Sequence, residues 1–326
     1  MIKQALNNDY IKGDLKVSVK TDSESPIGVF DSGVGGISVL RELVKIMPNE
    51  DYLYFGDSIN APYGTKEISR IRELTIKNVE KLMEMGAKSI VVACNTATSA
   101  AVRVLRKMYP DMPLVGIEPA IKPAVEYKEN SRVVVMATPM TLKQEKFQKL
   151  MEKYDGQAEI VPLPCPGLME FVERGDLEGD DLYKYLNILF GSVNQKKIDS
   201  VVLGCTHYPF AINAIKNVVG DDVKIFDGGE GTAREMRRRL AEAGLINNSG
   251  KKGKVKFINS KDTEEEKKTY YDFLKEKFCS DEYETNIIDE IIVKLQPEHI
   301  ITTNYDHLLE NVNDPRVSKY AIITKD

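Results

Sequence analysis

Short apolar runs recur along the chain, and each one predicts a buried strand. The first set lies at 27–30, 52–55, 89–93 and 113–117. These runs are rich in β-branched and aromatic residues without polar alternation, which is typical of parallel strands covered on both faces. Amphipathic patterns at 37–46 and 66–85 predict helices between them. Strands that alternate with helices in this order indicate an α/β fold.

The same order of strands repeats further along the chain. The second set of apolar runs lies at 132–136, 159–163, 200–204 and 223–226. Matched positions differ by 106 (133 − 27), 107 (159 − 52), 111 (200 − 89) and 110 (223 − 113) residues. Nearly constant offsets indicate a duplicated unit. We therefore expect two similar doubly wound parallel-sheet lobes related by pseudo-two-fold symmetry, with the active site in the interlobe cleft.

The runs also suggest where the domains begin and end. A polar stretch at 1–25 ends before Pro26 and predicts a loosely held N-terminal extension. After the last strand of the second set, 227–232 begins a helix, and the strand pattern at 254–258 and helical pattern at 263–278 would pack back on the first lobe. We expect a first lobe at 26–118 plus 227–278, a second lobe at 119–226 and a separate tail at 279–326.

Composition narrows the class of protein. The chain has 326 residues and a net charge of −5, and it lacks the basic face that nucleic acids and anionic membranes require. Four scattered cysteines without a C-x-x-C pair indicate reduced thiols, and three histidines without H-E-x-x-H give no sign of a metal site. No apolar run approaches the roughly 20 residues that span a bilayer. We expect a cytoplasmic protein with no metal, nucleic-acid or membrane partner.

Two cysteines occupy matching places in the two repeats. Cys94 and Cys205 lie 111 residues apart (205 − 94), each directly after the third strand of its lobe. In open α/β sheets ligands bind beyond the carboxyl ends of the strands, so both thiols are expected at the site. A thiol becomes a base when a neighbour lowers its pKa, and Asp31 and His207 are the candidate neighbours of Cys94 and Cys205.

Two thiols on opposite faces of a stereocentre offer a specific chemistry. One can remove a proton while the other returns a proton to the opposite face, which inverts the centre without a cofactor. Each cysteine alone could instead be a small buried hydrophobic residue, and His207 alone a structural hydrogen-bonder. The matching positions favour catalysis. Cys165, between two prolines, and Cys279, outside the repeat, are expected to be uninvolved.

Two loops could bind a ligand. The glycine-rich turn 31–36 could present backbone amides to a carboxylate or phosphate, or could simply be a tight strand–helix turn. The loop 56–64 is too long and too polar for a simple connector, which favours a binding loop.

The chain resembles the glutamate racemases of the aspartate/glutamate racemase superfamily. The resemblance covers about residues 26–278, and its motifs are Asp31-Ser-Gly-Val-Gly-Gly36, Pro62-Tyr-Gly64, Ala93-Cys-Asn-Thr96, Cys165-Pro-Gly-Leu-Met-Glu-Phe-Val-Glu173 and Gly204-Cys-Thr-His-Tyr-Pro209. It implies cofactor-independent interconversion of L- and D-glutamate, which supplies D-glutamate for peptidoglycan. It also implies a homodimer as one form of assembly.

The resemblance assigns roles by motif. Cys94 would be the base toward D-glutamate and Cys205 toward L-glutamate, with Asp31, His207 and Glu173 assisting. The substrate would be bound by Ser32, Tyr63, Gly64, Asn95, Thr96, Thr138, Thr141 and Thr206. One position departs from the family pattern, because Met140 precedes Thr141 where glycine is expected. Two alternatives remain open: a racemase for aspartate or another amino acid, and a binding or regulatory protein that keeps the cleft without turnover.

The tail has a second resemblance. Its segment Thr302-Thr-Asn-Tyr-Asp306 is similar to one in prokaryotic sirtuin-like NAD-consuming domains, in which the residues matching Asn304 and Asp306 lie in the NAD site. Such a site needs a glycine-rich strand–turn–helix upstream, and 279–299 contains no glycine. We therefore expect a fragment without NAD-consuming activity.

Overall fold

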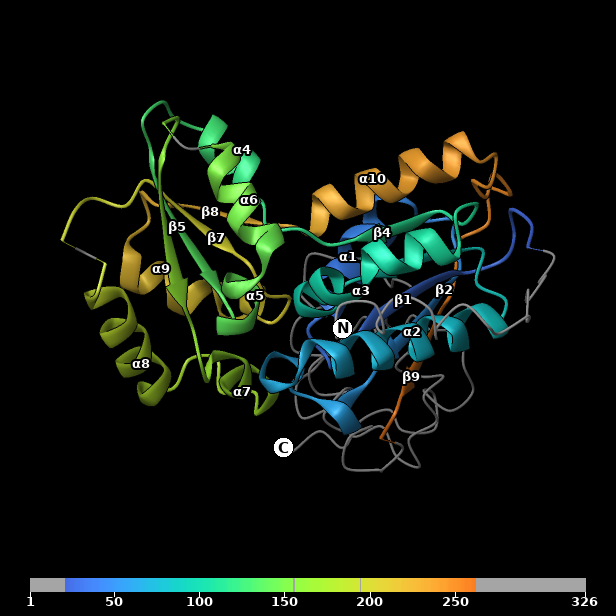
Figure 1. Ribbon diagram of the computed structural model, residues 1–326, viewed down its shortest axis with the longest axis horizontal. Coiled ribbons are helices and arrows are strands. Elements are labelled where there is room, and N and C mark those ends of the chain that lie inside the picture. The colour runs from blue at the N-terminus through green and yellow to red at the C-terminus, as the bar shows by residue number, and fades with distance from the viewer. Residues whose placement is uncertain (1–20, 155, 194, 262–326) are drawn as a thin grey trace, which may run out of the picture.

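The computed structural model describes residues 21–261 apart from 155 and 194, and their strands form two parallel sheets side by side (Figure 1). The first sheet has the order β4-β3-β1-β2-β9 and the second the order β6-β5-β7-β8. The expected helix at 263–278, Cys279, the tail with Asn304 and Asp306, and residues 1–20 lie outside the described residues.

The first sheet is built from the four strands of the first repeat and one late strand. Its strands are β1 (Ile27–Asp31), β2 (Tyr52–Gly56), β3 (Ser89–Val92), β4 (Leu114–Gly116) and β9 (Val255–Asn259). Alternate side chains of β1 enter different apolar clusters: Val29 lies in one with α1 (Ile37–Ile46) and α10 (Gly229–Glu242), and Phe30 in another with α2 (Ile68–Glu84) and α3 (Asn95–Met108). Both faces are thus covered by helices, which explains the continuous apolar runs.

The second sheet repeats this construction. Its strands are β5 (Arg132–Ala137), β6 (Glu159–Pro164), β7 (Ser200–Leu203) and β8 (Lys224–Asp227). Its helices are α4 (Ile121–Glu126), α5 (Pro139–Lys143), α6 (Glu145–Lys153), α7 (Leu168–Glu173), α8 (Asp180–Gly191) and α9 (Ile212–Val219). Val135 packs in a cluster with α4 and α6, whereas Met136 packs in a cluster with α8 and α9.

The strand order confirms the predicted two-lobed fold. Replacing each strand of the order β4-β3-β1-β2 by its counterpart gives β8-β7-β5-β6, which is the second sheet read from its other end. β9 has no counterpart there; it pairs in parallel with β2, from Tyr52↔Val255 to Gly56↔Asn259. The late strand therefore returns to the first sheet, as the pattern at 254–258 predicts.

The chain passes between the lobes twice, and the two passages touch. One lies between β4 and α4, and the other between β8 and α10. A Cβ placed on Gly228 would lie 2.4 Å from the carbonyl oxygen of Glu118, so only glycine permits this approach. Both passages therefore meet at one point between the lobes.

A buried ion pair connects segments that precede the strands of the first lobe. The Nζ atom of Lys88 donates to Glu50 and also, at 2.6 Å, to the carbonyl oxygen of Ser23. The lysine and glutamate side chains are 0% and 2% exposed. Through Lys88 the described end of the N-terminal segment is attached to the start of β3.

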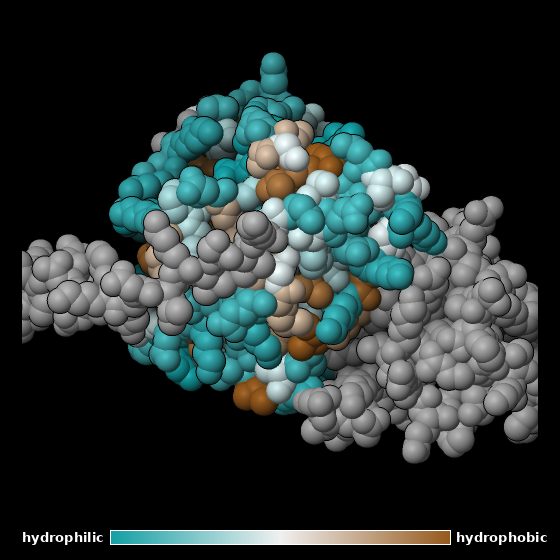
Figure 2. All heavy atoms as spheres, turned by 90° about the vertical axis from the view of Figure 1, so that its right-hand side faces the viewer, coloured by the Kyte–Doolittle hydropathy of each residue, from teal (hydrophilic) through white to brown (hydrophobic). Residues whose placement is uncertain are grey.

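The surface of the described residues is mainly polar. Figure 2 shows one end of the molecule, where hydrophilic side chains dominate and apolar ones form small separate groups. Large exposed apolar residues such as Ile59, Tyr127 and Ile188 come from separate parts of the chain. Within the described ranges, no helix combines the length and apolar character that crossing a bilayer demands.

Candidate active site

Cys94 lies at the junction of β3 and α3, facing the second lobe. It is the N-cap of α3, and its sulfur accepts a hydrogen bond from the backbone nitrogen of Ala97 at 3.5 Å. The hydroxyl of Ser32, from the loop after β1, lies 3.4 Å from the same sulfur. Burial, followed by the negative charge of Asp31, raises the pKa of the Cys94 thiol to about 12. Cys94 therefore favours the protonated form.

Asp31 ends β1 and connects the two lobes. It is fully buried, and its carboxylate accepts hydrogen bonds from the backbone nitrogen of Gly33 at 2.8 Å and from the hydroxyl of Thr206, in the second lobe, at 3.1 Å. Burial raises the pKa of Asp31, although the positive charge of His207 opposes the shift. The expectation that Asp31 lowers the pKa of Cys94 is wrong in sign, because a nearby carboxylate disfavours a second negative charge.

Cys205, His207 and Glu173 form a continuous line of contacts in the second lobe. The sulfur of Cys205 lies 3.7 Å from Nδ1 of His207, whose Nε2 lies 2.6 Å from Oε1 of Glu173. Burial would lower the pKa of His207, but its hydrogen bonds to Cys205 and Glu173 raise that pKa well above its usual value. Burial also acts to raise the pKa of Glu173, but the hydrogen bond and the positive charge of His207, with the amide of Val34, together lower that pKa below its usual value. The geometry thus favours an imidazolium between a carboxylate and Cys205.

The glycine-rich loop of the first lobe packs against this line. A Cβ on Gly33 would lie 2.6 Å from Oε1 of Glu173, and one on Gly35 would lie 2.4 Å from Nδ1 of His207. The backbone nitrogen of Val34 donates to Oε1 of Glu173 at 3.5 Å. The loop therefore presents an amide to a carboxylate of the protein itself, and its glycines permit the close approach of the lobes.

Threonines line the opposite part of the contact between the lobes. The hydroxyl of Thr96 lies 3.4 Å from that of Thr141, which lies 3.0 Å from that of Thr138. A Cβ on Gly64 would lie 3.5 Å from Cβ of Thr138, an ordinary contact. Oδ1 of Asn95 is buried and has no hydrogen-bond partner among the described residues. Hydroxyls and an unpaired amide oxygen suit a polar ligand.

The structure also shows the surroundings of Met140, Tyr63 and Cys165. Met140 is the second residue of α5, after the cap that Thr138 provides, so a side chain is accommodated where the family pattern has glycine. The side chain of Tyr63 is 1% exposed, and its hydroxyl donates to Asp57 at 2.6 Å. Any contact of Tyr63 with a ligand would therefore come from its backbone. Cys165 is buried and donates to the carbonyl oxygen of Leu163.

Sequence reasoning missed three polar residues near the site. Ser38 donates to the carbonyl oxygen of Thr206 at 3.0 Å, and Asp57 and Asn78 surround the hydroxyl of Tyr63. Asp57 falls within the loop 56–64 that the sequence singled out, but nothing marked it as buried. Ser38 and Asn78 lie within helices, where a polar residue is ordinarily assigned to the surface.

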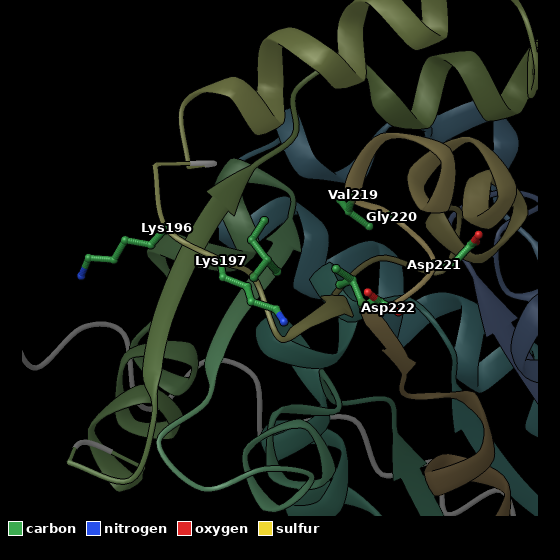
Figure 3. A pocket seen from close by; sticks show the side chains of 8 residues that line it. Lys196, Lys197, Val219, Gly220, Asp221 and Asp222 are labelled. Atoms are coloured by element: carbon green, nitrogen blue, oxygen red, sulfur yellow. The ribbon is translucent and has the colours of Figure 1, made fainter.

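One hollow of the described residues lies away from the two thiols. A hollow of the second lobe is lined by 196–198 and 219–223, and Lys197 and Asp222 are among the lining residues (Figure 3). These segments precede β7 and β8, so the hollow lies at the opposite edge of the sheet from Cys205. In the part of the chain that the structure describes, no three His, Cys, Asp or Glu side chains gather as metal ligands.

Comparison with known proteins points to one family. The family model described as Asp/Glu/Hydantoin racemase matches residues 27–236. A glutamate racemase of Clostridium novyi is 53% identical over 244 residues, which cover 75% of this chain and 94% of that protein. The crystal structure of glutamate racemase isoform RacE1 from Bacillus anthracis has a TM-score of 0.70 at 28% identity, covering 78% of this chain and 94% of that one. A glutamate racemase from Francisella tularensis, crystallised with D-glutamate, has a TM-score of 0.68 at 28% identity, covering 78% and 94%.

Proposed function

Since this chain belongs to the Asp/Glu/hydantoin racemase family, we propose that it interconverts L- and D-glutamate without a cofactor, using Cys94 and Cys205 as two opposed bases. The observation that most supports this is the pair of thiols that follow matching strands, β3 and β7, of two facing lobes. Hydrogen bonds from Thr206 to Asp31 and between Thr96 and Thr141 join the lobes around them.

The two thiols would act in sequence on one carbon. With L-glutamate bound, the Cys205 thiolate takes the α-proton: the C–H bond breaks and an S–H bond forms. The electron pair left on carbon then takes the proton of Cys94 from the opposite face, which leaves Cys94 as the thiolate. D-glutamate follows the reverse path. Each turnover therefore moves one proton onto Cys205 and one proton off Cys94, and no electron is lost or gained.

Neighbouring groups would make both steps feasible. The imidazolium of His207, held by Glu173, stabilises negative charge on the sulfur of Cys205. Cys94 starts as the thiol because burial and Asp31 disfavour its charge. The helix dipole and the amide of Ala97 then stabilise the thiolate that forms at the N-cap of α3.

Substrate binding would use hydroxyls, amides and the backbone of the glycine loops. The residues assigned to it are Ser32, Asn95, Thr96, Thr138, Thr141 and Thr206 by their side chains, and Tyr63 and Gly64 by their backbone. Of these residues, Thr96, Thr141 and Thr206 make hydrogen bonds between the lobes, and Gly64 lies opposite Thr138. Hydrogen-bond donors can hold the two carboxylates of glutamate without a paired cation.

The wider roles belong to the same proposal. The product D-glutamate would supply peptidoglycan synthesis, the protein would act in the cytoplasm, and two copies would form a homodimer. The lobes would comprise 26–118 plus 227–278 and 119–226. They would open about the two touching passages to admit substrate, because Cys94 and Cys205 are only 6% and 9% exposed. Cleavage of the loop 56–64 by a protease should then slow when glutamate is added.

The substrate and the two bases can be tested together. Circular dichroism of L-glutamate and L-aspartate, incubated separately with the protein, distinguishes a glutamate racemase from an aspartate racemase and from a binding protein without turnover. Cys94→Ser and Cys205→Ser should each abolish racemisation, because a hydroxyl is a much weaker base than a thiolate. Cys165→Ser is the matched control and should stay active, because it changes a buried thiol that donates to the carbonyl oxygen of Leu163 and has no part in the proposed mechanism. Near-normal turnover in either of the first two variants would refute the mechanism.

A further inference from the structure

The loop after β2 brings part of the first lobe to the second. The backbone nitrogen of Asp57 donates to the carbonyl oxygen of Asp31 at 3.0 Å, so the loop starts beside the site. It contains two short 3-10 helices, Ser58–Asn60 and Tyr63–Thr65. Gly64 lies opposite Thr138 of the second lobe, because a Cβ added to Gly64 would lie 3.5 Å from Cβ of Thr138. The position of this loop therefore sets one wall of the site.

A buried carboxylate organises the loop from inside the first lobe. Asp57 is 2% exposed, and all of its side-chain hydrogen bonds come from neutral donors. Its Oδ2 accepts from the hydroxyl of Tyr63 at 2.6 Å and from Nδ2 of Asn78 at 2.9 Å, and Nδ2 of Asn60 lies 3.0 Å and 3.1 Å from its two oxygens. A buried carboxylate is costly unless its oxygens are paired in this way.

The surroundings would suit apolar side chains better than these polar ones. Tyr63 lies in the same apolar cluster as Phe30, Ile71 and Cys94, and its ring centroid is 6.2 Å from that of Phe30. Asn78 lies on the buried face of α2, in the helix interior, where asparagine is a poor helix former. Stability alone therefore gives no reason for the set Asp57, Tyr63 and Asn78.

The contacts instead fix Tyr63 at both ends. Its ring is held in the core, while its hydroxyl donates to Asp57 and lies 3.3 Å from Nδ2 of Asn78. Burial, together with the hydrogen bond and charge of Asp57, raises the pKa of Tyr63, so the hydroxyl keeps the proton that it donates. With the side chain fixed, the backbone of Tyr63 and Gly64 has one position relative to Thr138.

We propose that Asp57 and Asn78 are positioning residues, which act through the hydroxyl of Tyr63 to fix the backbone of Tyr63 and Gly64 against the second lobe. This rests on the proposed function, since the backbone so placed is the part assigned to hold glutamate beside Cys94. Neither residue touches the reacting atoms. Their effect is on how the substrate is held for proton transfer.

The test compares single and double variants. Asp57→Asn replaces one acceptor oxygen by an amide NH₂ group, which would face the N–H and O–H donors that now bond to that oxygen. Tyr63→Phe removes the hydroxyl but keeps the ring. Each should reduce kcat/KM for glutamate about 10- to 100-fold, with KM raised, because a misplacement of about 1 Å has an effect of this size. The double variant should be no worse than the poorer single variant, since both changes remove the same contact. Asn78→Ala should reduce kcat/KM in the same direction.

Ile59→Ser provides the matched control. Ile59 lies in the same loop and is 60% exposed, so this variant should keep the wild-type kcat and KM. Three results would overturn the proposal: wild-type kinetics in Asp57→Asn, losses that multiply in the double variant, or losses that merely follow the fraction of unfolded protein measured by circular dichroism. Absence of glutamate turnover in the wild-type protein would instead overturn the proposed function, and with it the reaction assigned to this loop.

Discussion

Replacing Glu173 by Gln should shift the titration of His207. The change keeps the size of the side chain but removes the negative charge that lies 2.6 Å from Nε2. His207 is 2% exposed and Glu173 29% exposed, so the contact is poorly screened. A hydrogen bond to a charged group contributes about 1.5–3 kcal/mol. At about 1.4 kcal/mol for each pKa unit, the pKa of His207 should fall by about one to two units.

The shift has a definite sign in the pH profile. In the wild-type protein the pKa of His207 is raised, so the imidazolium persists above its usual range and is lost as pH rises through the raised value. Racemisation should decline over that pH range, and in Glu173→Gln the decline should begin about one to two pH units lower. The stability that the imidazolium gives to the fold should be lost over the same lowered range, because it is present only while His207 is protonated.

Two measurements check the shift directly. NMR of the protein labelled with ¹³C-histidine follows only three histidines, and the signal missing in His207→Asn identifies His207. The second measurement is kcat/KM for L- and D-glutamate from pH 6 to 10. The two enantiomers have equal free energy, so the two values must stay equal in every variant, which tests the assay itself.

Glu170→Gln is the matched control for this charge change. Glu170 lies on the same helix, α7, but is exposed, so this variant should leave the titration of His207 nearly unchanged. If Glu173→Gln lowered kcat yet left both the His207 titration and the pH profile in place, the carboxylate would not act through the imidazolium. His207 would then not be the group that stabilises the thiolate of Cys205.

Three further predictions concern the fold and the tail. Gly35→Ala should reduce kcat/KM at least about tenfold without unfolding the protein. The reason is that the added Cβ would lie 2.4 Å from Nδ1 of His207 and force the lobes apart. Steady-state kinetics measure the loss of activity, and a melting curve shows whether the protein stays folded. Lys88→Met should lower the free energy of unfolding by about 3–5 kcal/mol in urea, because it leaves a buried carboxylate without its cation. Ending the chain at Phe278 should leave racemisation intact, and the full chain should not hydrolyse NAD; NAD consumption lost in Asn304→Ala would contradict this.

The sequence predicted the buried strands well because burial on both faces restricts their residues. The predicted start and end of β1, β2 and β5 agree with the structure to within one residue, and those of β6 agree equally well although most of its residues are exposed or half-buried. The start of α3 was not predicted from the sequence, which placed Cys94 directly after a strand, whereas Cys94 is also the N-cap of a helix that begins at Asn95. Cysteine is not a usual N-cap residue, so the local sequence gave no start signal there.

The positions of the two cysteines were more predictable than the electrostatics around them. The duplicated strands placed Cys94 and Cys205 shortly after β3 and β7, as the structure has them, and topology brings the ends of parallel strands to one edge of a sheet. The sign of the effect of Asp31 was wrong, because that sign depends on distance and burial that a sequence does not specify. Likewise, a sequence cannot distinguish the buried carboxylate of Asp57 from an ordinary exposed one in a polar loop.

The unlike neighbours of the two thiols have a consequence for the protein between turnovers. On the proposed mechanism, each conversion of L- to D-glutamate leaves the free enzyme with its proton on Cys205 instead of Cys94. The protein must then return the proton before it can accept L-glutamate again. Cys205 faces an imidazolium and Cys94 a carboxylate, so the two free forms differ in energy and in population. At high substrate concentration this isomerisation of the free enzyme can become the slow step. The kcat and KM values would then differ between the L-to-D and the D-to-L direction, although the overall equilibrium constant is unity.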